Sequence, residues 1–287
     1  MQANDFSSLI ARVEAFLDRA EGFLPEHYKD DDLDGAIAFR WRKHGSRGHL
    51  QAVRNPHQIR LEDLQGIDRQ KETLEQNTAQ FVQRKPANNA LLWGSRGTGK
   101  SSLIKALLNA YHDRGLRVIE VEKDDLIDLP DIVDRIEGRD ERFVIFSDDL
   151  SFEAGDASYK ALKAILDGSL HQPPDNVLIY ATSNRRHLLP EHMRDNLDAR
   201  HVDGEIHESE AVEEKVSLSE RFGIWLSFYP FRQDGYLDIV GHWLQTMGCG
   251  DDPDAFRAEA LEWALRRGSR SGRSAYQFAR DYVGRRG

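Results

Sequence analysis

The sequence has little cysteine and no long apolar run. Its 287 residues include one cysteine, Cys249, which excludes an internal disulfide and favours a reducing compartment. No apolar run approaches the roughly 18 residues that a membrane-spanning helix needs. The first residues lack the basic start and apolar block of a secretory signal. We therefore expect a cytoplasmic protein that has no membrane partner.

Basic residues are outnumbered, 39 Lys and Arg against 49 Asp and Glu, so the formal net charge is −10. This balance argues against indiscriminate binding to nucleic acid. The segment from Arg40 to Arg60 departs from it, because it contains no acidic residue, and residues 266–287 are also rich in arginine. Two interpretations stay open for these segments: a solvated face or subunit contact, or a surface for nucleic acid or another acidic partner.

The middle of the chain alternates short apolar runs with helical patterns. Strands that are apolar on both faces and separated by helices are typical of a parallel sheet covered on both sides. The predicted strands are residues 89–93, 116–121, 142–147, 176–183 and 223–230. The predicted helices between the first four strands are residues 99–112, 129–138 and 157–170.

The pattern divides the chain into three predicted parts. Residues 1–60 are expected to form an N-terminal extension of helix, over residues 6–20, and irregular structure. Residues 61–230 are expected to form an α/β domain, with a helix that starts near Asp68. Residues 231–287 are expected to form a small all-helical domain, with helices at 233–246, 253–267 and 272–283.

A glycine-rich segment, GSRGTGKS, links the first predicted strand to the first predicted helix of the alternation and fits the pattern G-x-x-x-x-G-K-[ST]. Glycine lets backbone N–H groups surround a phosphate, and the following helix adds its positive end. We expect Lys100 to contact the β- and γ-phosphates and Ser101 to ligate Mg²⁺. A merely flexible loop would not need these two residues at these offsets. The predicted phosphate-binding residues are Gly94, Ser95, Arg96, Gly97, Thr98, Gly99, Lys100, Ser101 and Ser102.

Polar side chains follow two of the predicted strands. Asp148 and Asp149 come after the buried strand 142–147, at the edge where open α/β sheets bind ligands. We expect Asp148 to hold Mg²⁺ through water and Asp149 to polarise the attacking water. Asn184 follows strand 176–183 and is expected to orient that water. The alternatives are capping or solvated aspartates and a turn-forming asparagine.

These segments together resemble the AAA+ ATPases over about residues 60–287. GSRGTGKS resembles the Walker A motif, FVIFSDD the Walker B motif and ATSN the sensor 1 strand end. SGRSAYQFARDYV resembles sensor 2, which implies that Arg273, or alternatively Arg270, reaches the γ-phosphate. No N-K-x-D segment of the guanine-binding GTPases is present. The resemblance implies a P-loop three-layer α/β/α core with a parallel sheet, followed by a small helical lid.

Two further segments extend the resemblance to AAA+ proteins. LSERFGIWLSFYP resembles the arginine-finger segment, which implies that Arg221 points into the site of a neighbouring subunit. Its competitors for that role are Arg185, Arg186 and Arg194. LEDLQGIDRQ looks like the linker on the adenine side, which implies that Leu64, Gly66 and Ile67 lie near the base.

Several segments also resemble a bacterial family of ATP-binding proteins of unknown function, domain of unknown function 815. They are LLWGSRGTGKSSLIKALL, FSDDLSFE, YATSNRRHLLPE and EEKVSLSERFGIWLSFYPF. This resemblance implies ATP binding and the AAA+ fold, but no particular client. The acidic pair is Asp-Asp, whereas AAA+ proteins usually have Asp-Glu, and the shorter second carboxylate raises the question of how efficient hydrolysis is.

Two functions follow as hypotheses. The first is an ATPase that uses ATP and Mg²⁺ at a subunit interface to drive a switch or to remodel or load a macromolecular partner. The resemblance implies self-association in a hexameric ring or spiral and an unknown protein client. The second is an ATP-gated module with little hydrolysis, which docks a protein or nucleic acid through its N-terminal segment, including Arg40–Arg60. No aromatic pore loop is evident in residues 122–130, which argues against a threading unfoldase.

Overall fold

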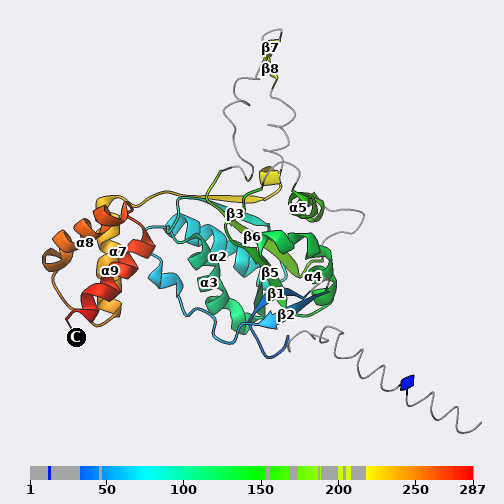
Figure 1. Ribbon diagram of the computed structural model, residues 1–287, viewed down its shortest axis with the longest axis horizontal. Helices are drawn as coiled ribbons and strands as arrows, with labels where there is room; N and C mark the ends of the chain where they lie inside the picture. The colour runs from blue at the N-terminus through cyan, green and yellow to red at the C-terminus, as the bar shows by residue number, and fades with distance from the viewer. Residues whose placement is uncertain are drawn as a thin grey trace, which may run out of the picture.

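The computed structural model describes residues 12–13, 33–44, 47–152, 156–167, 174–186, 188, 200–202, 205–207 and 218–286. Among these residues, seven strands form one sheet in the order β2-β1-β4-β5-β6-β3-β9 (Figure 1). Strand β2 is antiparallel to β1, and every other neighbouring pair is parallel. The strands are β1 (Ala38–His44), β2 (Arg47–Ala52), β3 (Ala90–Gly94), β4 (Leu116–Glu120), β5 (Arg142–Ser147), β6 (Val177–Ser183) and β9 (Ile224–Phe228). Strands β7 (Arg200–Val202) and β8 (Glu205–His207) pair separately.

Helices cover both faces of the sheet, as the alternating pattern predicts (Figure 1). Helices α2 (Asp68–Val82) and α3 (Lys100–Tyr111) pack on one face. Helices α4 (Leu129–Ile136) and α5 (Ala157–Asp167) pack on the other. Short 3-10 segments occur at Leu61–Asp63, His112–Arg114 and Lys123–Asp128.

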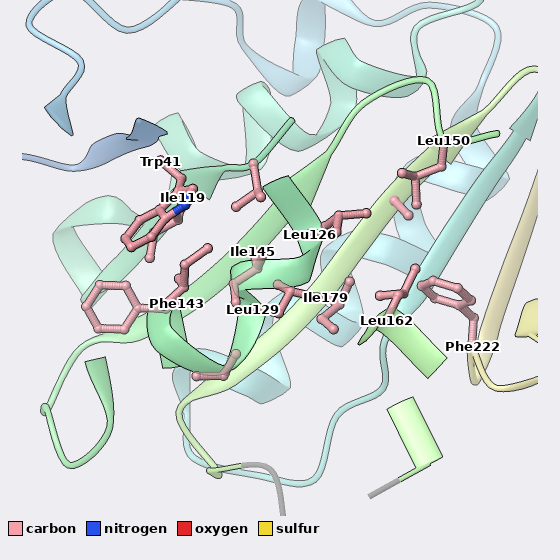
Figure 2. Close-up of a cluster of buried hydrophobic side chains, with 14 of the residues drawn as sticks. Trp41, Ile119, Leu126, Leu129, Phe143, Ile145, Leu150, Leu162, Ile179 and Phe222 are labelled. Carbon is pink, nitrogen blue, oxygen red and sulfur yellow. The ribbon is translucent and has the colours of Figure 1, made fainter. Parts of the chain in front are cut away.

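Strand β5 explains why both layers form. Successive side chains of a strand point to opposite faces, and all six residues of β5 are buried. Phe143 and Ile145 belong to the cluster under α4 and α5, which Figure 2 shows, whereas Val144 and Phe146 belong to the cluster under α2 and α3. Burying each such side chain stabilises the fold by about 1.5–3 kcal/mol. Strand β5 therefore stabilises the packing of helices on both faces of the sheet.

The hairpin β1–β2 corrects the prediction for residues 1–60. We expected helix and irregular structure there, but residues 38–52 add two strands to the sheet beyond β4. Phe39 and Trp41 are buried, while Arg40 between them is exposed. This period of two is a strand signal. The helix predicted over residues 6–20 falls outside the described residues except at 12–13, which are helical.

The C-terminal region is helical, as predicted. It contains α7 (Gln233–Thr246), α8 (Pro253–Arg267) and α9 (Gly272–Gly284), which pack around their own apolar cluster (Figure 1). The α/β fold with a parallel sheet and a helical C-terminal lid is therefore confirmed. Within the part of the chain that is described, no helix has the length and apolar character needed to cross a bilayer.

Candidate functional site

The turn between β3 and α3 has the backbone of a phosphate-binding loop. Gly94, Gly97 and Gly99 have φ angles of 128°, 73° and 103°, which side chains with a Cβ rarely adopt. A Cβ at Gly94 would lie 2.0 Å from the Phe228 carbonyl oxygen of neighbouring strand β9. The loop is closed from within, because the Thr98 hydroxyl donates to the Ser95 carbonyl at 2.7 Å. Glycine is thus required for packing as well as for conformation.

The Lys100 side chain folds back over this loop. Its ammonium donates to the carbonyls of Gly94 and Ser95 at 2.7 and 2.8 Å, and to Asn184 Oδ1 at 3.4 Å. The residue is only 7% exposed. Lys100 and Asn184, which were both predicted as site residues, are therefore in contact, although 84 residues separate them in the sequence.

The electrostatic surroundings of Lys100 are mixed. Burial lowers the pKa of its ammonium below the ordinary value of 10.5. The charges of Asp148 and Asp149 oppose this shift of the pKa, whereas those of Arg96 and Arg273 add to it. A buried cation whose pKa is lowered in this way is stabilised by an added anion, which suits a phosphate.

Asp148 lies at the expected edge of the sheet. Its Oδ1 accepts from the Ser101 hydroxyl at 2.6 Å and from the Thr182 hydroxyl at 2.5 Å. The two residues predicted to hold Mg²⁺, Ser101 and Asp148, are thus in direct contact. Hydroxyl and carboxylate oxygens are ligands that Mg²⁺ prefers, together with phosphate oxygens and water, so the donor set fits this ion.

Asp149 is held in an unusual backbone conformation. Its φ angle is +55°, which costs a non-glycine residue about 1–3 kcal/mol. Its N–H donates to the Thr182 hydroxyl at 2.9 Å, and its Oδ1 accepts from the Asn184 amide. Its other oxygen, Oδ2, lies 3.5 Å from the Arg96 guanidinium. These contacts fix the direction of the carboxylate predicted to polarise water.

The lid and the linker approach the loop from two further sides. The Arg273 N–H donates to the Gly97 carbonyl at 3.3 Å. The Arg270 carbonyl accepts from the Phe231 N–H at 3.3 Å. Ile67 is buried, and its Cδ1 lies 3.3 Å from the place of a Cβ on Gly99. These contacts place both segments beside the loop; the choice of Arg273 over Arg270 and the position of Ile67 near the base stay predictions.

Arg221, the predicted finger, is not part of this cluster. Its guanidinium donates to Asp167 at the end of α5. Among its competitors, Arg186 lies over the Trp93 ring, 5.8 Å from the centroid, and Arg185 is exposed. Arg194 lies outside the described residues. The role of Arg221 in a neighbouring site stays a prediction.

Thr182 was missed by the sequence reasoning. It is 1% exposed, donates to Asp148, and accepts from the N–H of Asp149. Thr182 therefore links the end of β6 to both aspartates. A hydroxyl residue two positions before Asn184, at the end of a buried strand, was the available signal.

Several basic residues of the segment Arg40–Arg60 form ion pairs with carboxylates. Three cations of β1, which pairs with β4, contact Glu120 at the end of β4 and two carboxylates of the segment that follows it. This pairing supports the interpretation as a structural face and argues against a free basic surface at these three positions. The ion pairs are Arg40–Glu120 at 2.6 Å, Arg42–Glu122 at 3.1 Å and Lys43–Asp128 at 2.9 Å.

Comparison with solved structures gives the class of fold. RuvB from Thermotoga maritima matches in several forms. A single-residue variant has a TM-score of 0.54 and 16% identity, with 77% of this chain and 63% of that chain covered. The RuvB Holliday junction branch migration motor has a TM-score of 0.51, 17% identity and the same coverage. The alignment thus spans less than two thirds of the RuvB chain. This likeness shows that the chain shares the fold of these RuvB structures.

The family is shown by the sequence. A family described as Protein of unknown function (DUF815) matches residues 34–286, which is most of the chain. The protein therefore belongs to this family, as its motifs predicted. No curated protein matches it.

Proposed function

We propose that the protein binds Mg-ATP between the phosphate-binding loop and the helical lid and hydrolyses it. One observation carries the proposal. Lys100, Ser101, Asp148, Asp149 and Asn184 come from three separate segments and form one hydrogen-bonded cluster at the carboxyl edge of the sheet. That edge is where open α/β sheets bind nucleotides.

Each residue of the cluster has a role in this proposal. Lys100 and the loop amides bind the β- and γ-phosphates. Ser101 and Asp148 would hold Mg²⁺, which offsets phosphate charge when bound. Asp149 accepts a proton from the attacking water, and Asn184 orients that water against the carboxylate. The lid adds Arg273 at the phosphate end, and Ile67 contributes an apolar surface near the base.

We further propose that hydrolysis takes place at a subunit interface. Arg221 contacts Asp167 within its own subunit, at the end of α5, and in this proposal it is the arginine that a neighbouring subunit would receive. An arginine supplied by a neighbour accelerates phosphoryl transfer by about 10³–10⁵. Assembly, in a ring or spiral, would then control turnover.

The outcome of hydrolysis would be a conformational switch that loads or remodels a macromolecular partner. One of the RuvB structures is described as a Holliday junction branch migration motor, so nucleic acid is one class of partner to test. The ion-paired hairpin does not favour contact through Arg40, Arg42 and Lys43. We therefore favour a protein partner, with nucleic acid as the alternative.

The test of hydrolysis is phosphate release from Mg-ATP by the parent and by Asp149→Asn. The variant keeps the shape of the side chain but cannot accept the proton, so we expect turnover to fall by about 10²–10⁴ while Mg-ATP still binds. Asp140→Asn is the matched control, because Asp140 is exposed and precedes β5 at the opposite edge of the sheet. Equal turnover by Asp149→Asn and the control would contradict the role of Asp149. Asp149→Asn held with ATP also serves to capture the partner.

A further inference from the structure

Arg96 lies in the middle of the phosphate-binding loop and has one partner among the contacts described. Its guanidinium is 3.5 Å from Oδ2 of Asp149, and the two side chains are 77% and 56% exposed. The loop backbone on either side of it is fixed by Ser95, which receives the Thr98 hydroxyl, and by Gly97, which receives the Arg273 N–H. A fixed backbone with an unpacked side chain leaves the guanidinium able to move.

This pair engages the carboxylate that the proposed hydrolysis needs. Oδ1 of Asp149 accepts from the Asn184 amide, and Oδ2 faces Arg96. Each oxygen thus has a partner from the same chain, and a water that binds Oδ2 has to share it with the guanidinium. Without a γ-phosphate, the chain therefore holds its own base in an ion pair.

The ion pair between Arg96 and Asp149 is weak enough for Arg96 to leave Asp149 and bind a phosphate instead. Exposed pairs between arginine and a carboxylate contribute little, because water screens both charges. A phosphate offers more charge and a geometry that matches the planar guanidinium in two parallel hydrogen bonds. Arg96 stands next to Ser95 and Gly97, whose carbonyls receive Lys100 and the Arg273 N–H, so it lies in the part of the loop that would surround the phosphates.

We propose that Arg96 detects the γ-phosphate within its own subunit. It pairs with Asp149 when the γ-phosphate is absent, and it moves to the γ-phosphate when ATP binds, which releases Asp149 for the attacking water. ADP lacks this group and leaves the pair intact. The inference rests on the proposed function and adds to it: the loop itself distinguishes ATP from ADP and couples that distinction to the base.

The experiment is calorimetric titration of the full chain with ADP and with the β,γ-imido analogue of ATP, which is not hydrolysed, both with Mg²⁺. Arg96→Ala should weaken binding of the analogue by about 10-fold to 100-fold and leave the affinity for ADP unchanged. Arg96→Lys keeps the charge but loses the two parallel hydrogen bonds, so its loss should be smaller. Arg84→Ala, which removes the exposed partner of Asp140, should change neither affinity.

The exchange itself is tested with a double-mutant cycle. Asp149→Asn removes the competing carboxylate, so the analogue should bind several-fold more tightly, and this gain should vanish in the Arg96→Ala background. A gain of equal size in both backgrounds would show repulsion of phosphate by Asp149 and would overturn the exchange. A parent chain that binds neither nucleotide would overturn the proposed function as well. A parent that binds both, with an unchanged ratio in Arg96→Ala, would overturn this inference alone.

Discussion

At the residue scale, the site depends on a few groups in costly states. Lys100 is a cation with 7% exposure, and Asp149 has a φ angle of +55°. Lys100 is held by the bonds it donates to two carbonyls of its own loop, and Asp149 by hydrogen bonds with Thr182 and Asn184 at the end of β6. Strained or desolvated groups persist where surrounding contacts fix them, and they concentrate at functional sites.

Tyr180 gives a pH-dependent prediction at this scale. It is 1% exposed, and its hydroxyl accepts from Asn77 at 2.9 Å and lies 3.0 Å from the Thr78 hydroxyl. Burial raises the pKa of Tyr180 to about 12. The folded state then binds this proton more tightly than the unfolded state, so the stabilisation is complete below pH 10 and is lost as the pH rises towards 12.

The measurement is urea unfolding of the parent and Tyr180→Phe from pH 8 to pH 11. The difference in free energy of unfolding should be constant below pH 10. Above it, the advantage of the parent should shrink by about 1.4 kcal/mol per pH unit. A difference that stays level up to pH 11 would contradict the buried, hydrogen-bonded hydroxyl.

At the element scale, the sequence predicted the strands and helices whose pattern is regular. Residues 142–147 and 253–267 have the same bounds in the structure as in the prediction. The hairpin β1–β2 was missed because the segment was interpreted by its charge, as a solvated face, a subunit contact or a surface for an acidic partner. Two of its cations pair instead with Glu120 at the end of β4 and with Asp128, and these carboxylates become neighbours only when the sheet forms.

The candidate site was also predicted only in part from the sequence. The glycine spacing of the loop singled out Lys100 and Ser101, and the buried strand 142–147 singled out the two aspartates that follow it. The contacts of Thr182 and the Arg96 side chain depend on which strands are adjacent and on where each side chain points. These contacts join residues that are far apart in the sequence, so no local pattern indicates them and they became visible only in the structure.

Gly48 tests the packing of the hairpin. A Cβ at this position would lie 1.8 Å from the Trp41 ring, which is fixed by a hydrogen bond from its Nε1 to Asp128 at 2.9 Å. We expect Gly48→Ala to lower the free energy of unfolding by about 1–3 kcal/mol. Gly235→Ala in α7 is the control, because no atom lies within 4 Å of its Cβ. Equal results for the two variants in urea unfolding would show that the Trp41 ring does not occupy this place.

At the scale of the whole molecule, the proposed nucleotide site includes residues of both the α/β core and the helical C-terminal region. The core contributes the loop and both aspartates, and the lid contributes Arg273 through its contact with Gly97. The two also meet where the His242 ring lies 3.3 Å from Asp63. A ligand that binds both parts can change their relative position, which is how the proposed switch would transmit ATP binding to a partner.

Assembly is tested at this scale by the dependence of turnover on protein concentration. If Arg221 acts on a neighbouring site, turnover per subunit should rise as subunits associate. At concentrations where the parent is assembled, Arg221→Ala should lower turnover by about 10³–10⁵ while Mg-ATP still binds. A dilute monomer already at the full rate, with no effect of the substitution, would exclude a finger in trans. Arg257→Ala, on the exposed side of α8, is the control.

The central claim is that the loop before α3 binds the phosphates of ATP with Lys100 inside it. The most direct measurement is calorimetric titration with Mg-ATP of the parent, of Lys100→Ala and of Lys105→Ala, an exposed lysine on the same helix, after circular dichroism has shown that all three are folded. The account predicts similar binding by the parent and Lys105→Ala, and at least about 100-fold weaker binding by Lys100→Ala. No heat with the parent, or equal affinity for all three, would contradict it.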